Sequence, residues 1–245
     1  FVLLCEYHCF YILTNIESNH QQIQNSSMNE ASQEISEPLF DFSNFYQNDF
    51  LADCSLLIKD SNGTLNSTIR AHKIVLANSS DYFLDMFTSG MKESVTNEVD
   101  IRISNEIEIQ LFPQIINYIY TGEIDISLDS FIPILHMARK YRIKQLIEEL
   151  INYLDTNLTA NDIIPLITQC YDLQFSSELE LFDKYIIKFF NSIPISVLSD
   201  ALDVNTFCRI IQKMNISDIE QRIDIINQFI SSYESTDFTY SFKLK

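Results

Sequence analysis

The sequence contains few residues that make turns. Only 3 glycines and 5 prolines occur among its 245 residues. A β-sandwich or β-barrel shows a turn signal about every 8–12 residues, so this composition argues against both and favours helices joined by short connections. So few glycines also cannot build a glycine-rich phosphate-binding loop.

Basic residues are scarce as well. Lys and Arg number 16 against 34 Asp and Glu, which gives a formal charge of −18. A strongly acidic surface repels phosphate groups. We therefore expect neither nucleic acid nor a membrane as a partner, and the charge favours proteins with basic surfaces.

The 5 cysteines form no recognisable framework. Their odd number, their scattered positions and the lack of a CxxC pair argue against disulfides and against a zinc site. This usage is typical of a reducing compartment, so we expect a cytoplasmic or nuclear protein. Cys54, Cys170 and Cys208 have apolar neighbours and are predicted to be small core residues.

The sequence shows no constellation of catalytic residues. His8, His20, His72 and His136 are scattered, and no Ser or Cys forms a nucleophile elbow beside His72. The many carboxylates are not arranged as an isolated pair in an apolar site. We expect a non-enzymatic protein with no catalytic residue, metal or cofactor, in which His72 is structural.

The N-terminal region is expected to lie outside the fold. The opening run FVLLCEYHCFYIL is too short to span a bilayer, which takes about 20 apolar residues. We interpret it as a fragment edge or an incorrectly extended start, with a decayed signal sequence as the alternative. Residues 17–37 are polar and are predicted to be a disordered linker. The fold should begin near Pro38.

Two strand patterns and a turn follow. The segment CSLLIKD precedes SNGT, which predicts a hairpin with strands at 54–58 and 65–70 and a turn at Asn62-Gly63. Further on, apolar and charged residues alternate over residues 99–103, which predicts a half-buried strand.

Helical spacing dominates the rest of the chain. Apolar residues in segment 71–87 recur at helical intervals, with Ser79 or Ser80 as a cap for the second part and Gly90 as a stop. Pro113 is expected near the start of the next helix, because an interior proline would break it.

Several further helices can be placed from their starting residues. Residues 128–140 form a predicted helix entered through Ser127, and residues 143–155 form another. Three capping-box patterns mark later helix starts, namely Thr159–Asp162, Ser177–Glu180 and Ser217–Glu220. The order is therefore a small mixed region followed by helices.

An ordered series of motifs resembles a BTB (POZ) domain. The motifs are FLADCSLLI, IRAHKIVLANSSDYFLDMF, MKES, YIYTGEIDIS and HMARKYRIKQLIEELINYL. Residues 156 to about 230, with DLQFSSELELFDKYIIKFF, resemble the helical BACK extension of that family. The resemblance implies an α+β, mostly helical protein, in which a BTB/POZ fold with a small three-stranded sheet flanked by helices precedes an all-α BACK-like domain.

The resemblance also divides the chain into parts. The expected parts are an N-terminal extension at 1–37, a BTB/POZ domain at 38–155, a BACK-like helical domain at 156–235 and a C-terminal tail at 236–245.

The same resemblance implies a cullin-binding site. BTB proteins that serve cullin-three ubiquitin ligases carry a hydrophobic–x–Glu motif after their third helix, and here the pattern is Met91-Lys92-Glu93, with Phe87 one turn upstream. A methionine adapts to an irregular pocket because it is flexible and polarizable. The alternative is that Met91 packs against its own helix and Glu93 is solvated.

Two further sites are implied. Dimerisation through the BTB domain is expected to use Leu39, Phe42, Phe45 and Tyr46, although these residues could instead cover the domain's own sheet. Asp53 and Lys73 correspond to a charged pair in a pocket near the dimer axis of the family. Their alternative is a surface ion pair with little net effect.

Several functions remain open at this point. The leading hypothesis is a substrate adaptor that joins a cullin-family scaffold to an unidentified substrate protein. The alternatives are a BTB homo-oligomerisation scaffold without a ligase role and a transcriptional regulator, although the chain has no zinc fingers and its charge is wrong for DNA. No separate recognition domain is apparent, so the chain is part of a longer protein, or the BACK-like helices or a partner subunit bind the substrate.

Overall fold

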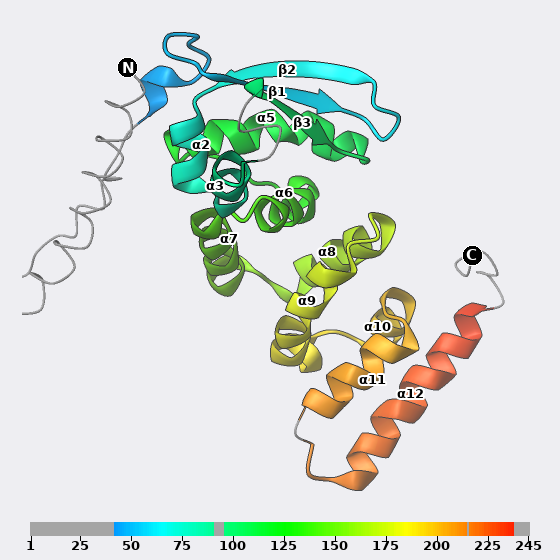
Figure 1. Ribbon diagram of the computed structural model, residues 1–245. Helices are drawn as coiled ribbons and strands as arrows, with labels where there is room; N and C mark the ends of the chain where they lie inside the picture. Colours follow the sequence, from blue (N-terminus) through cyan, green and yellow to red (C-terminus); the bar gives the residue numbers. More distant parts are fainter. Residues whose placement is uncertain (1–41, 91–95, 215, 238–245) are drawn as a thin grey trace, which may run out of the picture. The chain divides into compact units, whose positions relative to one another are not determined.

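The computed structural model describes residues 42–90, 96–214 and 216–237. Its one described sheet has three strands in the order β2-β1-β3 (Figure 1). The central strand β1 (Cys54–Lys59) is antiparallel to β2 (Leu65–Ala71) and parallel to β3 (Glu98–Arg102). The predicted hairpin and the predicted half-buried strand are confirmed.

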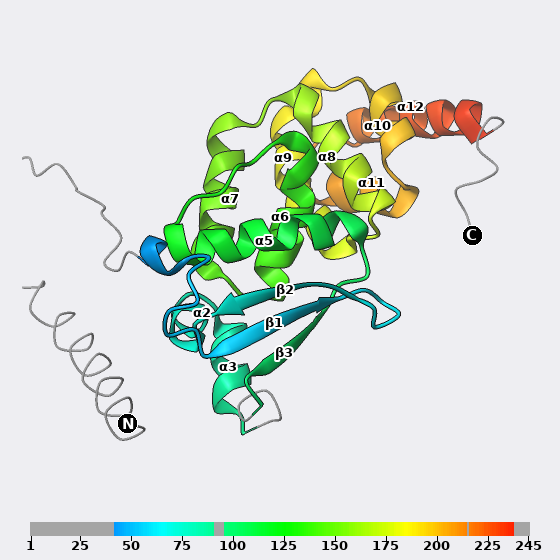
Figure 2. The same cartoon turned by 90° about the horizontal axis from the view of Figure 1, so that it is seen from above.

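One face of the sheet packs against helices. Cys54, Leu56 and Ile58 of β1 are fully buried, while the residues between them are half-exposed. Leu56 is paired with Val99 of β3, which is also buried. Figure 1 shows most of the helices below the sheet, and Figure 2 shows the three strands side by side. The alternation of buried and exposed residues therefore follows from the period of two along a strand.

Two short helices connect β2 to the segment before β3. The helices are α2 (Lys73–Ser79) and α3 (Asp81–Thr88). Ser80 caps α3, because its hydroxyl accepts a hydrogen bond from the backbone N–H of Phe83. Gly90 follows with a φ of +71°, a left-handed conformation that glycine adopts without steric cost. The predicted cap and stop are both confirmed.

The expectation for Pro113 is wrong. α5 (Glu106–Thr121) begins earlier than predicted, because the Asn105 side chain caps it by accepting from the backbone N–H of Ile107. Pro113 therefore lies inside the helix. Phe112, Ile115 and Ile116, on both sides of it, are fully buried. Their packing outweighs the cost of an interior proline, which is about 3 kcal/mol.

Helices make up the rest of the described chain. They are α6 (Leu128–Lys140), α7 (Lys144–Asn157), α8 (Ala160–Asp172), α9 (Ser176–Phe189), α10 (Ile195–Ala201), α11 (Val204–Lys213) and α12 (Ile219–Asp237). Two short 3-10 helices, η1 (Ser43–Phe45) and η2 (Phe190–Ser192), precede the sheet and follow α9. The predicted class, α+β and mostly helical, is confirmed.

Of the three predicted capping boxes, one is confirmed and two are wrong. Asp162 accepts from the backbone N–H of Thr159 and caps α8 as predicted. α9 begins at Ser176 with Phe175 before it, so the Ser177 pattern lies inside the helix. At α12 the capping residue is Asp218 rather than Ser217, because the Asp218 carboxylate accepts from the backbone N–H of Glu220. In both cases a helix does begin close to the predicted position, but at a different residue.

The core prediction for the cysteines is also partly wrong. Cys54 and Cys170 are buried in the core, but Cys208 is exposed. Cys208 belongs to α11, whose inward face is formed by Phe207, Ile210 and Ile211. Its position in the helical turn directs it away from that face.

Candidate protein-interaction surfaces

Phe87 lies in the last turn of α3, before the predicted cullin-binding loop. Its ring stacks on Phe83 with centroids 6.1 Å apart, and the Lys73 ammonium lies 5.6 Å from its centroid. Phe87 is half-buried. Met91 and Glu93 lie outside the described residues, so their role stays a prediction.

Asp53 contacts Lys73 through the backbone N–H of the lysine. The Asp53 carboxylate accepts from the backbone N–H of Lys73 at 2.8 Å. The Lys73 ammonium donates to the Asn97 side-chain carbonyl at 2.7 Å. This links the start of β1, the start of α2 and the entry to β3. A pocket at a dimer axis stays a prediction for these two residues.

The aromatic residues before β1 partly cover their own domain. Phe42, Phe45 and Tyr46 are half-buried and pack against the core. The Tyr46 hydroxyl donates to the Pro113 carbonyl at 3.4 Å. Leu39 lies outside the described residues. These three side chains leave only part of their surface for a partner, and their place in a dimer interface stays a prediction.

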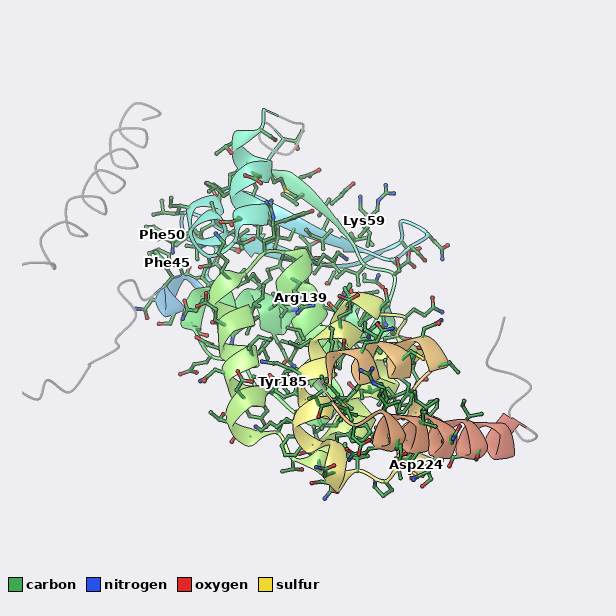
Figure 3. The ribbon with its side chains drawn as sticks, turned by 90° about the horizontal axis from the view of Figure 1, so that it is seen from below. Phe45, Phe50, Lys59, Arg139, Tyr185 and Asp224 are labelled. Carbon is green, nitrogen blue, oxygen red and sulfur yellow. The ribbon has the colours of Figure 1, made fainter. Side chains whose placement is uncertain are left out.

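A more exposed apolar group lies next to them. Phe50 is 66% exposed, Leu51 is 70% exposed and Ile74 is 54% exposed. Figure 3 shows Phe45 and Phe50 at the same end of the domain, and both contact His72. Leu51 adopts a φ of +62°, a conformation that costs energy for a branched residue. Phe50, Leu51 and Ile74 are thus among the exposed large apolar side chains of this part of the chain.

His72 holds this exposed segment in place. Its Nε2 lies 2.8 Å from the Phe50 carbonyl, and its Nδ1 lies 3.0 Å from the Tyr120 hydroxyl. The Tyr120 hydroxyl also accepts a hydrogen bond from the backbone N–H of His72. Because a carbonyl oxygen can only accept, Nε2 carries a hydrogen and donates it to the Phe50 carbonyl. Burial raises the pKa of Tyr120 to about 12, so its hydroxyl stays protonated at neutral pH and can keep these hydrogen bonds.

A second polar cluster joins α5, α6 and α9. Glu108 and Glu178 are almost fully buried and both face His136, at 4.0 Å from Nε2 and 3.4 Å from Nδ1 respectively. The His136 ring stacks on Phe175 with centroids 3.8 Å apart. Arg139 approaches Glu178 at 3.7 Å and Lys140 approaches Glu108 at 3.9 Å. Figure 3 shows Arg139 amid these helices.

The two carboxyls in this cluster differ in acidity. Burial raises the pKa of Glu108, and the Lys140 ammonium at 3.9 Å offsets this effect only in part. Burial acts in the same direction on Glu178, but the contact with His136 and a hydrogen bond from Ser177 outweigh it and lower the pKa. Sequence reasoning missed this cluster, since its members come from three helices without a local motif.

Two buried thiols among the described residues are poorly suited to nucleophilic chemistry. Burial raises the pKa of Cys54 and of Cys170 to about 12, which keeps both thiols protonated and poor nucleophiles. No group of three or more His, Cys, Asp or Glu side chains within the described ranges could hold a metal ion. Among the described helices, none is long and apolar enough to cross a membrane.

Comparison with known proteins agrees with the arrangement of sheet and helices. Residues 42–158 match the BTB/POZ domain family. Human BTB/POZ domain-containing protein 3 is 32% identical over 124 residues, which are 51% of this chain and 23% of that protein. Mouse Kelch-like protein 28 is 32% identical over 130 residues, which are 51% of this chain and 21% of that protein. The chain spans less than a quarter of the length of these relatives.

The fold and the family match together define the class of protein. Residues 42–158 are a BTB/POZ domain, with α2, α3, α5 and α6 around a three-stranded sheet. The helices from α8 onward are consistent with a BACK-like extension.

Proposed function

We propose that this protein is an adaptor that links a cullin-three RING ligase to a target protein and carries no chemistry itself. The observation that carries the proposal is the position of Met91-Lys92-Glu93 directly after α3 of a BTB/POZ domain. The half-exposed ring of Phe87 lies in the last turn of the same helix. In this proposal Met91 is the apolar anchor, Phe87 extends the apolar surface, and Glu93 meets a basic group of the cullin.

Calorimetry of the whole chain with the N-terminal domain of cullin-three tests this proposal. Loss of a buried anchor costs about 2 kcal/mol, so Met91→Asp should weaken binding at least about 30-fold. Leu65→Asp is the matched control, because Leu65 is 53% exposed at the far end of the β1–β2 hairpin. Equal binding by wild type and Met91→Asp, or none by either, would refute the cullin site.

We also propose that the protein forms a twofold dimer through the BTB domain. The exposed side chains of Phe50, Leu51 and Ile74 support this interface, and His72 contacts both Phe45 and the Phe50 carbonyl. The Phe50→Asp/Leu51→Asp double variant should sediment as a monomer while Leu65→Asp stays dimeric. A monomeric wild-type protein would contradict this part of the proposal.

The second candidate function is an oligomerisation scaffold without a ligase role. The same exposed group favours it, because self-association needs only that surface. A dimer that does not bind the cullin would support the scaffold and refute the adaptor. For either function we propose a cytoplasmic or nuclear location, since Cys54 and Cys170 are unpaired; microscopy of a tagged chain tests it.

A further inference from the structure

The ammonium group of Lys73 contacts side chains from two other parts of the fold. Lys73 is the first residue of α2 and is half-buried. Its Nζ donates a hydrogen bond to the Asn97 side-chain carbonyl at 2.7 Å and lies 5.6 Å from the centroid of the Phe87 ring. Phe87 belongs to the last turn of α3, and Asn97 directly precedes β3. One charged group therefore connects α2 with the end of α3 and the entry to β3.

The backbone on both sides of this connection is anchored to the sheet. At the start of α2, the Asp53 carboxylate accepts from the backbone N–H of Lys73 at 2.8 Å, and Asp53 directly precedes β1. At the entry to β3, the Asn97 backbone carbonyl accepts from the N–H of Ser55 in β1 at 2.8 Å. Asn97 adopts a φ of +57°, a left-handed conformation in which asparagine is enriched among non-glycine residues. These anchors restrict where the Lys73 ammonium can lie.

The Phe87 ring is contacted by one aromatic and one charged side chain. It stacks on the fully buried Phe83 ring at a centroid distance of 6.1 Å and an interplanar angle of 16°. The Lys73 ammonium lies within the distance of about 6 Å at which a cation is attracted to an aromatic ring. A half-buried side chain has more than one staggered rotamer open to it, so a cation fixed beside the ring favours the orientation in which the ring meets that cation.

We propose that Lys73 is a positioning residue for the cullin-binding surface and holds the Phe87 ring in the orientation that the cullin meets. The inference rests on the proposed function, in which Phe87 extends the apolar surface at the end of α3. Ordering a side chain on binding costs free energy, so a ring that the ammonium already holds binds more tightly than one that must first be ordered. In this inference Lys73 acts through Phe87 and not through a contact of its own with the cullin.

This inference places the charge of Lys73 at the cullin-binding surface, whereas the family resemblance implies a charged pocket near the dimer axis. The two roles predict different consequences of the same substitution. Removal of the ammonium from a pocket at the dimer axis alters self-association. Removal of a positioning cation changes the surroundings of the Phe87 ring and leaves the oligomeric state as it is in the wild-type protein.

A double-mutant cycle, measured by calorimetry of the whole chain with the cullin domain, tests the inference. Lys73→Met removes the charge and keeps an unbranched side chain, and we expect it to weaken binding about two- to fivefold, as the loss of one cation–π contact does. Phe87→Leu removes the aromatic ring. In the Phe87→Leu background, Lys73→Met should have no further effect, because the residue through which it acts is gone. Lys73→Arg should bind like wild type, because a guanidinium also stacks on aromatic faces.

Lys188→Met is the matched control for this substitution. The Lys188 ammonium lies 5.0 Å from the centroid of the Phe189 ring, so the change removes the same kind of contact from the end of α9. Neither residue belongs to the proposed cullin-binding surface, and cullin binding should be unchanged. Circular dichroism establishes that each variant is folded, and sedimentation compares its oligomeric state with that of the wild-type protein.

Fluorine NMR provides a second readout that does not need the cullin. In the whole chain, para-fluorophenylalanine incorporated in place of Phe87 reports the surroundings of the ring. We expect its fluorine resonance to shift on Lys73→Met and to stay unchanged on Lys188→Met. A resonance that Lys73→Met leaves in place would show that the ammonium does not orient this ring, and would overturn the inference even if the protein binds the cullin.

Other results would also overturn the inference: unchanged cullin binding by Lys73→Met, an equal loss in the Phe87→Leu background, or an equal loss in Lys188→Met. A dimer that is lost in Lys73→Met would assign the residue to the dimer axis instead. Absence of cullin binding by the wild-type protein would refute the proposed function and the role of Lys73 in it, while the fluorine resonance would still decide whether Lys73 orients the Phe87 ring. The two failures are therefore distinguishable.

Discussion

The BTB/POZ domain and the helices after it bury polar groups in different ways. In residues 42–158 the buried His72 is hydrogen-bonded to the Tyr120 hydroxyl, and the buried carboxyl of Glu108 lies 3.9 Å from the Lys140 ammonium and 4.0 Å from the His136 ring. In the extension, Asp183 is 2% exposed and receives three hydrogen bonds of 2.7–3.0 Å from Arg209 and Lys213. Asp203 is bonded to Tyr171 and Thr206.

This difference predicts that ionisation of Asp183 stabilises the folded state and that ionisation of Glu108 destabilises it. A carboxylate with complete charged hydrogen bonds stabilises the fold when ionised, whereas one that is buried without close partners destabilises it. The domain is therefore expected to depend on apolar packing, and the extension on bonded charges. Four substitutions test this contrast.

The largest effect is expected from Phe83→Ala in the domain. Phe83 is fully buried and its ring lies parallel to that of Tyr141, with centroids 5.9 Å apart. Removing such a side chain leaves a cavity and should lower the free energy of unfolding by about 3–5 kcal/mol. Urea denaturation measures it, with Leu84→Ala, 43% exposed on the same helix, as control. A loss below about 1 kcal/mol would show that the domain does not depend on this packing.

The second-largest loss of stability is expected from Asp183→Asn in the extension. The substitution leaves Arg209 and Lys213 without their carboxylate, but both cations are partly exposed and can reach water. We expect a loss of about 2 kcal/mol at pH 7, at the low end for a buried ion pair. Asp85→Asn is the control, since the Asp85–Arg142 ion pair lies on an exposed surface and its loss should matter little.

The pH dependence of this variant follows from the acidity of Asp183. Burial opposes its ionisation, but the hydrogen bonds from Arg209 and Lys213 prevail and lower its pKa below the usual 3.8. Its stabilisation is therefore present above about pH 4 and is lost as the pH falls through the lowered pKa. The difference between wild type and Asp183→Asn should shrink below pH 4. A difference that is constant down to acid pH would contradict the charged bond.

Glu108→Gln should have a smaller effect of the opposite sign. The pKa of Glu108 is raised by burial from its usual 4.5, so ionisation disfavours the folded state. Stability from the neutral carboxyl is present below the unfolded pKa and is lost as the pH rises through the folded pKa. The variant should thus be more stable than wild type at pH 7 and equal to it near pH 4. If the Glu108→Gln variant were less stable than wild type at pH 7, the ionised carboxylate of Glu108 would be stabilised by Lys140 and His136 rather than destabilised by burial.

These buried acids could not be predicted from the sequence, unlike the local elements. Asn62-Gly63 and the alternation around Val99 predicted the strands, because turn chemistry and period-two burial are local. Asp183 of α9 is hydrogen-bonded to Arg209 and Lys213 of α11, which lie 26 and 30 residues further along the chain. No local spacing encodes such a contact.

The incorrect predictions have the same cause. Pro113 was expected near a helix start because intrinsic preference disfavours it elsewhere, but the packing of Phe112 and Ile115 holds α5 together around it. The Ser177 and Ser217 patterns resemble caps in sequence, yet the chain enters α9 and α12 at other residues. Tertiary contacts decide such boundaries. Of the interaction surfaces, the family resemblance indicated the loop at Met91, while the exposure of Leu51 and Ile74 required the structure.

The smallest effect on stability is expected from Cys208→Ser, and chemical labelling of the thiols measures their exposure directly. Cys54 of the domain and Cys170 of the extension are buried, and burial raises the pKa of each to about 12, so at pH 8 about one in ten thousand is ionised. Cys208 is exposed on α11. In a Cys5→Ser/Cys9→Ser background, a maleimide should therefore modify Cys208 in the native protein, and Cys54 and Cys170 only after denaturation. Cys208→Ser should abolish native labelling while changing stability by less than about 0.5 kcal/mol. Rapid labelling of Cys170 before Cys54 would instead reveal that the extension opens locally while the domain stays closed, which would extend the contrast between the two regions from their charges to their dynamics.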